Sequence, residues 1–576
     1  MSIASEKSIH DTNQVSVSWL QRIWNFSGCV LGVLVFVLMI KYSKQPLTID
    51  VIFTIVLAEW CRWANNQRRK RATSPKKCDD PLYLLEKGDT TPSDTDVIAA
   101  VVGYREEPAL FKRALESYLE AQGCRFLLIC IDGDTEDDEE MIDVFREACK
   151  EDSAVIHLDV PFADIALKMD EESNSCTSEN EIVARCCSIA RAILNEKGVR
   201  FSGKGAISRL CVNQRHMHKK GIMFTSFIIS MVVSDILGID YLWTSDSDSI
   251  VFPDTLTRTI STFSTDPKVG GASTALYIHN KDETLITKLG TGVYLNELYL
   301  ARSFTGSAAA NDCQSGPSAV FRVPAVRTEL LGWYKQNVLG HWMVVNEDRH
   351  LTTRLLLKGW QVVFASDVLT ATESPTTLRR WLLQQVRWAR AVHVESFHRP
   401  GVYLMQSPIL FFAAMRRQTA AFLVPTSVTI YVVTGVIPFM GFTIQDLLQR
   451  LVLTFVYLFL RNPYRPRLRE WLWTFPATLF YHLPLPAIQI WSFVTVLHDS
   501  WGTSMRSKKE FAKQSKLRLR LWEVGFFVVW MGIVGGAIGR YTASALMFDP
   551  AQTALCILLG IGSLVGLWGS WMVTAE

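Results

Sequence analysis

The sequence predicts an α/β domain inserted between transmembrane α-helices. Apolar stretches lie toward both ends of the chain, a long polar segment separates them, and strand-like runs alternate with helical ones inside that segment. The composition agrees, because 49% of the 576 residues are hydrophobic and 20% are charged. This mixture is too apolar for a uniformly soluble protein and too polar for a membrane bundle alone. The net charge of only +3 produces no strong overall field, so nucleic acid is not an expected partner.

Two membrane spans are predicted within residues 24–64, after an N-terminal tail of residues 1–23. The runs Asn25–Ile40 and Ile49–Trp63 are each near the short end of the ~20 residues that a bilayer core requires. The first run starts late and is followed by no small-residue cleavage site. A span is therefore favoured over a cleavable signal peptide.

Charged residues in and after the second run indicate its surroundings and its orientation. Asp50 and Glu59 lie within the run, so we expect it to pack against other helices or to face a polar cavity. A basic linker over residues 65–95 follows the run. Its clustered basic residues are Arg68, Arg69, Lys70, Arg71, Lys76 and Lys77. Because positive residues beside a span favour the cytosolic side, the linker is predicted to be cytosolic rather than a nucleic-acid patch.

A cytosolic α/β domain is predicted for residues 96–399, where we expect no apolar run long enough to cross a bilayer. The strand-like runs are Val97–Gly103, Phe126–Asp132, Ala154–Val160, Tyr241–Ser245 and Val362–Ala365. Helical stretches between them predict a largely parallel sheet. The polar, acidic stretch Asp164–Asn180 is predicted to be a surface insertion.

Apolar sequence resumes in residues 400–576 and predicts about four further spans with interfacial helices. The candidate spans are Phe422–Phe442, Leu447–Leu460, Val524–Ile538 and Thr553–Val573, and Gln406–Met415 is a candidate interfacial helix. The run Trp471–Leu497 contains three prolines and precedes a basic stretch. If this run crossed, the basic stretch would lie outside. We therefore expect it to be re-entrant, which gives six spans and places both termini in the cytosol.

An acidic pair follows the fourth strand-like run. One turn can present Asp246 and Asp248, two positions apart, to a divalent cation and a diphosphate. Mg²⁺ or Mn²⁺ accepts oxygen ligands and offsets the charge that builds on a departing diphosphate. A D-x-D sequence alone is commonly a solvated turn. The strand before it and the motifs after it favour a metal site.

Two further polar motifs complete the candidate site. Glu347 and Asp348 precede a helix-like run, where an acid can cap the helix or remove a proton from an attacking hydroxyl. Arg387 and Trp388 can bind phosphate oxygens and the flat face of a sugar. With Trp381, the same Arg-Trp pair also suits interfacial anchoring. The twelve cysteines have no ligand spacing and are predicted to be reduced thiols rather than a zinc site.

The order of these motifs resembles that of the processive inverting glycosyltransferases of family 2, which include the cellulose, chitin and hyaluronan synthases. Other segments are most similar to hyaluronan synthases and to the fungal hyaluronan-synthase-like type 2 transferases. These segments are Val101–Pro108, Asp132–Asp134, Ser315–Pro317, Asn346–Thr352 and Trp501–Arg506. Gly203-Lys204-Gly205 has glycine where the family's G-K-R motif has arginine. A loop near residues 499–506 resembles the family's gating loop, but Met505 replaces a glycine there. The resemblance implies a GT-A-type fold for the cytosolic domain.

The resemblance also implies a role for each matched residue. The residues that would hold the nucleotide are Tyr104, Glu106, Asp132, Lys204, Asp246, Gln384, Arg387, Trp501 and Arg506. Asp248, together with Asp246, would bind the cation. Asp348 would be the general base, with Glu347 beside it. The residues that would hold the acceptor sugar are Ser315, Gly316, Pro317 and Trp388. Cys313 is either a further lining residue or a structural thiol.

The function implied is a processive, inverting polymerase in the plasma membrane. It would transfer sugars from a UDP-sugar to a growing glycan and pass a β-linked polysaccharide, hyaluronan-like or related, through the bilayer. Two alternatives stay open: a non-processive transferase that glycosylates a lipid, and a transporter with a degenerate transferase domain. A lipid-linked product would favour the first. Absence of UDP release with every UDP-sugar would favour the second.

Overall fold

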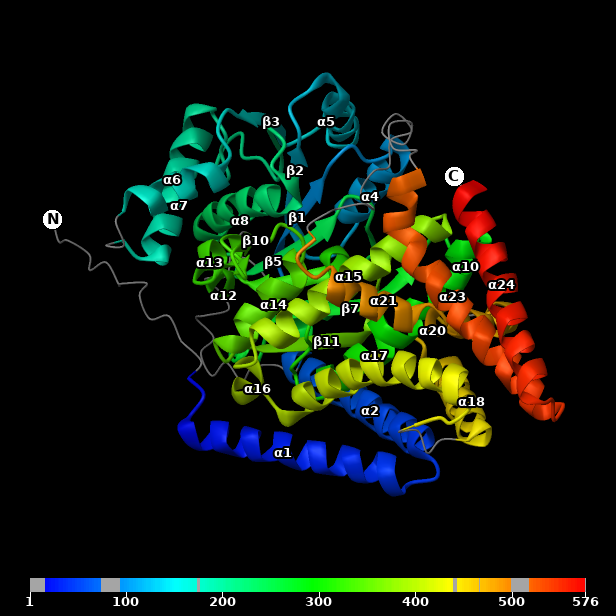
Figure 1. Cartoon of the computed structure of the whole chain (residues 1–576). Helices are drawn as coiled ribbons and strands as arrows, with labels where there is room; N and C mark the ends of the chain where they lie inside the picture. The colour runs from blue at the N-terminus through cyan, green and yellow to red at the C-terminus, as the bar shows by residue number, and fades with distance from the viewer. Residues whose placement is uncertain are drawn as a thin grey trace.

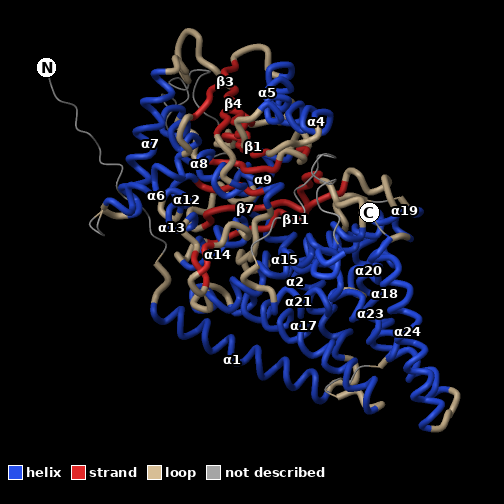
Figure 2. The backbone as a smooth tube through the Cα atoms, turned by 45° about the horizontal axis from the view of Figure 1, so that its top comes forward, coloured by secondary structure: helices blue, strands red, loops and turns tan. Residues whose placement is uncertain are grey.

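The computed structural model of the chain describes residues 16–73, 94–173, 177–438, 443–465, 467–498 and 517–574. The strands lie in one part of the molecule with helices around them, and the other part is helical (Figures 1 and 2). The predicted combination of an α/β domain with flanking apolar helices is therefore confirmed.

A nine-stranded mixed sheet forms the centre of the α/β domain. Its spatial order is β3-β4-β2-β1-β5-β8-β7-β11-β6. The strands are β1 Val97–Gly103, β2 Cys124–Asp132, β3 Ser153–Leu158, β4 Arg209–Gln214, β5 Tyr241–Asp246, β6 Ile250–Val251, β7 Val269–Ile278, β8 Ala319–Arg322 and β11 Gln361–Thr372. Pairing is parallel from β3 to β5 and between β7 and β11. By contrast, β8 is antiparallel to β5 and β7, and β6 to β11. All five predicted strands are present, and the sheet is parallel only in part.

Helices cover both faces of this sheet, which explains the continuous apolar sequence of β1. The residues from Val97 to Val102 are buried, as expected for a strand between two helical layers. One layer contains α6 Phe162–Glu172, α7 Glu179–Glu196 and α8 His218–Leu237, and the other contains α4 Pro108–Leu119 and α5 Glu136–Ala148. The predicted surface insertion Asp164–Asn180 is different in the structure: much of it belongs to α6, which buries Ala166 in the core.

Four helices of the described chain combine the length and the hydropathy that a membrane crossing needs. They are α1 Trp19–Tyr42, α8, residues Leu519–Ala545 of α23 and α24 Pro550–Thr574. The apolar window of α8 is 83% buried, because this helix packs against β1 and β2 inside the α/β domain. Residues 96–399 therefore do contain an apolar run of spanning length, contrary to expectation, and its apolar character reflects the core. The other three helices coincide with predicted spans.

The remaining predicted spans correspond to α2 Pro46–Thr73, α17 Pro408–Thr434 and α18 Ile444–Arg461. Helix α17 contacts α1 and α23 Leu517–Ala545, and α18 contacts α2 (Figure 1). Helix α17 starts at Pro408 and so takes in most of the predicted interfacial helix Gln406–Met415. Their crossing of the bilayer stays a prediction.

The two acids of the second predicted span pair with other helices, as their position in the sequence indicated. Asp50 Oδ1 lies 3.2 Å from Nε of Arg416 on α17, and Glu59 Oε1 lies 3.1 Å from Nε of Arg461 on α18. The proline-containing run Trp471–Leu497 is divided among three short helices. These are α19 Leu468–Leu472, α20 Thr474–His482 and α21 Leu485–Val494.

Candidate active site

A cavity of about 1920 Å³ extends from the carboxyl ends of β1, β2 and β5 to the helices on the membrane side. Its wall includes Asp50 of α2, Arg416 of α17 and Arg450 of α18. It brings together every described residue predicted for the site except Lys204. Those residues are Tyr104, Glu106, Asp132, Asp246, Asp248, Ser315, Gly316, Pro317, Glu347, Asp348, Gln384, Arg387 and Trp388. Trp501 and Arg506 lie outside the described residues, as does the loop near 499–506.

Asp132 stands at the end of β2 and organises one end of the cavity. Its Oδ1 accepts a hydrogen bond from the backbone N–H of Met217 at 2.8 Å, and its Oδ2 lies 2.9 Å from His216 Nδ1. The His216 ring packs on that of Tyr104 with centroids 4.5 Å apart. The hydrogen bond to Asp132 raises the pKa of His216, although burial opposes this change. Tyr104 and Asp132, from neighbouring parallel strands, are thereby held together.

The turn after β2 has its shape because α5 begins with a reciprocal capping arrangement. Thr135 Oγ1 donates to Asp138 Oδ2 at 2.6 Å, and the Thr135 backbone N–H donates to the same oxygen at 3.1 Å. Arg105 Nε holds the other oxygen of Asp138 at 3.1 Å. A Cβ on Gly133 would lie 2.3 Å from the Asp138 carboxyl carbon, so only glycine fits there. The predicted Asp-Gly-Asp segment thus depends on close packing against a capped helix.

The acidic pair lies at the end of β5, as its position after an apolar run predicted. Between its members, Ser247 Oγ donates to Glu106 Oε2 at 2.9 Å, which joins the pair to the turn after β1. Asp248 is buried, and Ser249 Oγ donates to its Oδ1 at 3.1 Å. Burial raises the pKa of Asp246, and the charge of Asp248 raises it further, against the effect of Lys219. Two carboxylates that disfavour each other's charge in a buried site suit a divalent cation.

Within the described part of the chain, no group of three or more His, Cys, Asp or Glu side chains could hold a metal ion. A cation at Asp246 and Asp248 would therefore complete its shell with oxygens of a bound ligand or of water.

Lys219 is a functional residue that the sequence analysis missed. It lies in the first turn of α8, and its Nζ is 2.6 Å from Asp246 Oδ1 and 2.9 Å from Glu347 Oε1. A Cβ on Gly316 would lie 2.9 Å from this Nζ and 3.0 Å from Asp246 Oδ2. The predicted Ser-Gly-Pro segment therefore contacts this ion pair closely, and a side chain at position 316 would displace the Lys219 ammonium.

The protonation states of this cluster follow from its charges. Burial alone would lower the pKa of Lys219, but Asp246 and then Glu347 outweigh burial and raise it. Burial would raise the pKa of Glu347, but Lys219 and then Arg387 lower it. The ammonium and the Glu347 carboxylate are therefore both charged at neutral pH. Glu347 is buried with this partner, while Asp348 beside it is only half-buried.

The structure places Lys204 apart from the other residues predicted for the site. Its side chain is exposed in a turn between α7 and β4, and it does not line the cavity. The lysine that contacts Asp246 in the cavity is Lys219, at the start of α8. A local signal for it exists, because His218-Lys219-Lys220 begins a long helix that is otherwise apolar.

Asp348 faces the cavity from the first turn of α14 Glu347–Leu357. Its Oδ1 accepts a hydrogen bond from the Arg349 backbone N–H at 2.6 Å, and its Oδ2 lies 3.5 Å from Cys313 Sγ. Burial, with the nearby Asp348 charge, raises the pKa of the Cys313 thiol to about 12. Cys313 is therefore a protonated thiol that lines the cavity beside the predicted base.

A buried network fixes where α14 begins. Asn346, the residue before the helix, has a left-handed backbone with φ of 88°. Its side-chain amide donates to Glu395 Oε1 on α15 at 2.8 Å, and His350 Nδ1 lies 2.9 Å from the same oxygen. Gln336 Nε2 donates to it at 3.0 Å. The predicted base and the Arg-Trp motif are thus parts of one packed unit.

Helix α15 Leu378–His398 presents the Q-x-x-R-W motif to the cavity. Gln384, Arg387 and Trp388 are spaced i, i+3 and i+4, share one helix face and are half-buried. Trp381, two turns before Trp388 on the same side of the helix, is buried, and its ring centroid is 4.7 Å from that of Phe480. Neither tryptophan is highly exposed, which argues against the interfacial-anchor interpretation.

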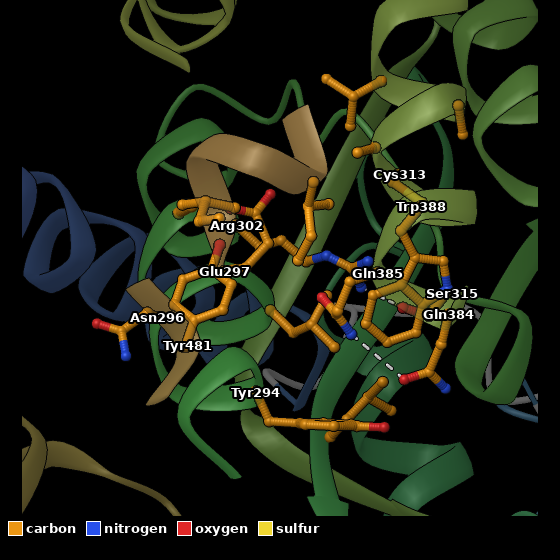
Figure 3. A pocket seen from close by; sticks show the side chains of 18 of the residues that line it. Tyr294, Asn296, Glu297, Arg302, Cys313, Ser315, Gln384, Gln385, Trp388 and Tyr481 are labelled. Atoms are coloured by element: carbon orange, nitrogen blue, oxygen red, sulfur yellow. Dashed lines mark hydrogen bonds between the residues drawn. The ribbon is translucent and has the colours of Figure 1, made fainter. Parts of the chain in front are cut away.

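Figure 3 shows Trp388 in the pocket with Gln384, Gln385 and Ser315 near it and Tyr294 on another side. The rings of Trp388 and Tyr294 pack edge to face with centroids 6.4 Å apart. Arg302 Nη1 donates to Ser315 Oγ, and Ser245 Oγ on β5 donates to the Pro317 carbonyl at 2.9 Å. Flat aromatic faces beside amide groups form a surface that suits a sugar ring.

A diacid at strand ends, a half-buried acid beside it and an Arg-Trp helix, all facing one cavity that reaches apolar helices, define a membrane glycosyltransferase. Comparison with known families agrees: residues 242–485 match the model described as "Glycosyl transferase family group 2". This part of the chain is therefore similar to the family 2 glycosyltransferases, the group that its motifs resemble.

Curated relatives extend this similarity over most of the chain. Hyaluronan synthase 3 of Xenopus laevis is 26% identical over 486 residues, which are 82% of this chain and 78% of the relative. Hyaluronan synthase 2 of Rattus norvegicus is 26% identical over 300 residues, 51% of this chain and 50% of the relative. Among solved structures, the mannosyltransferase PcManGT from Pyrobaculum calidifontis, in complex with GDP-Man and Mn²⁺, is 14% identical. It covers 79% of this chain and 99% of its own, and its TM-score of 0.38 is too low to establish a shared fold.

Proposed function

We propose that the protein is a processive, inverting glycosyltransferase. It polymerises sugars from a UDP-sugar into a β-linked polysaccharide, hyaluronan-like or related, and passes the product across the membrane. One observation carries the proposal: the acidic pair, Asp348 and Trp388 line the same cavity as membrane-side residues such as Asp50 and Arg416. A polymer held by Trp388 would therefore have a route toward the bilayer helices without leaving the protein. The similarity to hyaluronan synthases supports a polysaccharide product.

The reaction would be a direct displacement at the anomeric carbon of the donor. Asp348 would take the proton of the acceptor hydroxyl as its oxygen forms the new glycosidic bond. The bond from the anomeric carbon to the diphosphate breaks, and UDP leaves with the electron pair. A positioned base contributes roughly 10²–10⁴-fold to such a rate. Half-buried Asp348 suits this role better than Glu347, which is buried and neutralised by Lys219.

The remaining residues would bind and orient the two substrates. Tyr104, Glu106 and Asp132 would hold the nucleoside, and Lys219 with Arg387 would lie along the diphosphate. A Mg²⁺ or Mn²⁺ ion, when bound at Asp248 and Asp246, would offset the negative charge that the leaving diphosphate acquires. Trp388 with Ser315 to Pro317 would position the terminal acceptor sugar.

The Asp348→Asn variant tests the proposal. The full-length protein, purified in detergent, is given UDP-sugars with Mg²⁺ or Mn²⁺, and UDP release and product size are measured. We expect the wild type to form a large polysaccharide and the variant to lose polymer formation at least 100-fold. UDP binding should stay unchanged, because Asp348 is not among the nucleotide ligands. Retained elongation would remove Asp348 from the base role, and a lipid-soluble product would contradict polymer synthesis.

We further propose that the protein lies in the plasma membrane with the catalytic domain and both termini in the cytosol. The donor is made in the cytosol and the product leaves the cell in this arrangement. The basic residues at the end of α2, among them Arg68 and Arg71, support it. Protease accessibility in right-side-out vesicles tests the orientation.

A further inference from the structure

Four charged side chains connect the start of α14 with α17. Arg349 Nη1 lies 2.7 Å from Asp312 Oδ2, and Arg417 Nη1 lies 3.0 Å from the same oxygen. The other terminal nitrogen of Arg417 lies 3.1 Å from Glu297 Oε1. We name Arg349, Asp312, Arg417 and Glu297 the Asp312 clamp. They come from α14, the segment before Cys313, α17 and the π-helical turn Asn296–Ala301.

The clamp is a half-buried cluster with balanced charge. Its side chains are between 11% and 26% exposed, and two guanidinium groups face two carboxylates. Burial alone would raise the pKa of Asp312, but Arg349 and then Arg417 outweigh burial and hold it well below its usual range. Asp312 is therefore an anion between two arginines over the whole physiological pH range.

One end of the clamp contacts the predicted base. The Arg349 backbone N–H donates to Asp348 Oδ1 at 2.6 Å, so the residue that Asp312 holds by its side chain also orients the Asp348 carboxylate. The other end lies in the wall of the cavity, which includes both Glu297 and Arg417. Figure 3 shows Glu297 beside Tyr481, across the pocket from Trp388. A chain of direct contacts thus joins the base to the wall beyond the acceptor site.

Stability alone does not explain such a cluster. Taking four charges out of water is costly, and packed apolar side chains often hold a buried position as well or better. What charged groups add is a specific arrangement, because an Arg fork binds two carboxylates only in a narrow range of positions. The clamp is therefore suited to fixing the distance and angle between α14 and α17.

We propose that the Asp312 clamp is a positioning device that ties the orientation of Asp348 to the glycan path beside α17. Arg417 and Glu297 hold Asp312 from the cavity wall, Asp312 holds Arg349, and Arg349 orients the base. A glycan passing Glu297 and Arg417 contacts the same groups that set the base. Its presence there completes the alignment for the next addition. This inference rests on the proposed function.

The test uses a charge-neutral double variant, Arg417→Met with Glu297→Gln, in the full-length protein. It removes one cation and one anion, leaves the Arg349–Asp312 pair intact and frees α14 from α17. Elongation is measured per UDP-binding site, together with the KM for the donor and the length of the product. We expect kcat to fall about 10- to 100-fold, because a misplacement of about 1 Å costs roughly 10²-fold. Donor KM should be unchanged and the product shorter.

Two further variants complete the test. Arg417→Lys keeps the positive charge but loses the guanidinium group that binds two carboxylates. We therefore expect a smaller loss of kcat than in the double variant, about 3- to 10-fold. Arg461→Gln breaks an arginine–carboxylate pair between α18 and α2 that does not line the cavity, and should keep wild-type turnover. A purely structural clamp would lower the number of UDP-binding sites without changing turnover per site.

Wild-type turnover per UDP-binding site in the double variant would overturn the inference. If that variant binds no UDP, wild-type turnover in Arg417→Lys would overturn it, and a loss would support it. These outcomes differ from failure of the proposed function, in which the wild type itself would make no polymer.

Discussion

Lys219 is the residue whose replacement tests the electrostatics of the site most sharply. It pairs with Asp246 at 2.6 Å and with Glu347 at 2.9 Å, and the Glu347 side chain is only 2% exposed. Replacement of Lys219 by Met keeps much of the side chain's volume and removes the charge. It leaves Glu347 as a buried carboxylate without the cation that now touches it.

The expected cost follows from that burial. Removing one partner of a buried ion pair destabilises a protein by about 3–5 kcal/mol, because the other charge stays uncompensated. For a domain of this size we expect the melting temperature at pH 8 to fall on the order of 5–10 °C. Thermal unfolding of the detergent-purified protein, followed by tryptophan fluorescence, measures it.

The pH dependence of the melting temperature distinguishes an uncompensated Glu347 charge from a simple loss of packing in Lys219→Met. In the wild type the pKa of Glu347 is lowered, so its contribution to stability is present above its ordinary pKa and is lost as pH falls through the lowered value. In Lys219→Met the uncompensated carboxylate has a raised pKa and takes up a proton more easily as pH falls. The difference in melting temperature between the wild type and Lys219→Met should therefore be widest at pH 8 and should narrow toward pH 5. Adding Glu347→Gln to Lys219→Met should close most of this gap at pH 8. A gap that is independent of pH, and that Glu347→Gln does not reduce, would refute this reasoning.

Three further predictions follow from the same geometry. Gly316→Ala should lower turnover at least 10-fold with little loss of expression, because its Cβ would lie 2.9 Å from Lys219 Nζ and 3.0 Å from Asp246 Oδ2; wild-type kinetics would contradict this close approach. Lys204→Ala should keep activity within about 2-fold, since that side chain is exposed and outside the cavity, whereas a large loss would return Lys204 to the site. The pKa of His216 is raised by Asp132, so its stabilising effect is present below its ordinary pKa and is lost as pH rises through the raised value. His216→Gln should therefore lower the melting temperature at pH 6 and leave it nearly unchanged at pH 9, and the reverse order would show that His216 is not the group concerned.

The fold could be predicted where a single local pattern carried the information. β1 was readable because its residues are apolar on both faces, and β5 because an apolar run ends at the acidic pair. β7 was missed because Gly270, Gly271 and two hydroxyl residues weaken its strand pattern. β8 has four residues, and its antiparallel pairing with β5 and β7 depends on contacts distant in sequence. Helix α8 shows the same limit, since its composition alone does not distinguish a core helix from a span.

Some residues of the candidate site could likewise be predicted from a local pattern, and others could not. Carboxylates after strands and an Arg-Trp pair on a helix were recognisable because one turn or one helix face presents each motif. Lys219 and the Asp312 clamp were not, because their partners are far away in the sequence. Only the position of the start of α8 in the fold shows that the lysine after His218 is the one that meets Asp246 and Glu347. Similarly, only the approach of α17 shows that Arg417 meets Asp312.

The central claim is that the catalytic cleft and the path into the membrane helices form one continuous route for the glycan. Electron cryo-microscopy of the full-length protein, incubated with its UDP-sugar and Mg²⁺ or Mn²⁺, tests this directly. We expect saccharide density that starts at Trp388 beside Asp348 and continues past Glu297 and Arg417 toward Arg450. A product chain that leaves the cleft toward the cytosol, with no density between α17 and α18, would contradict it.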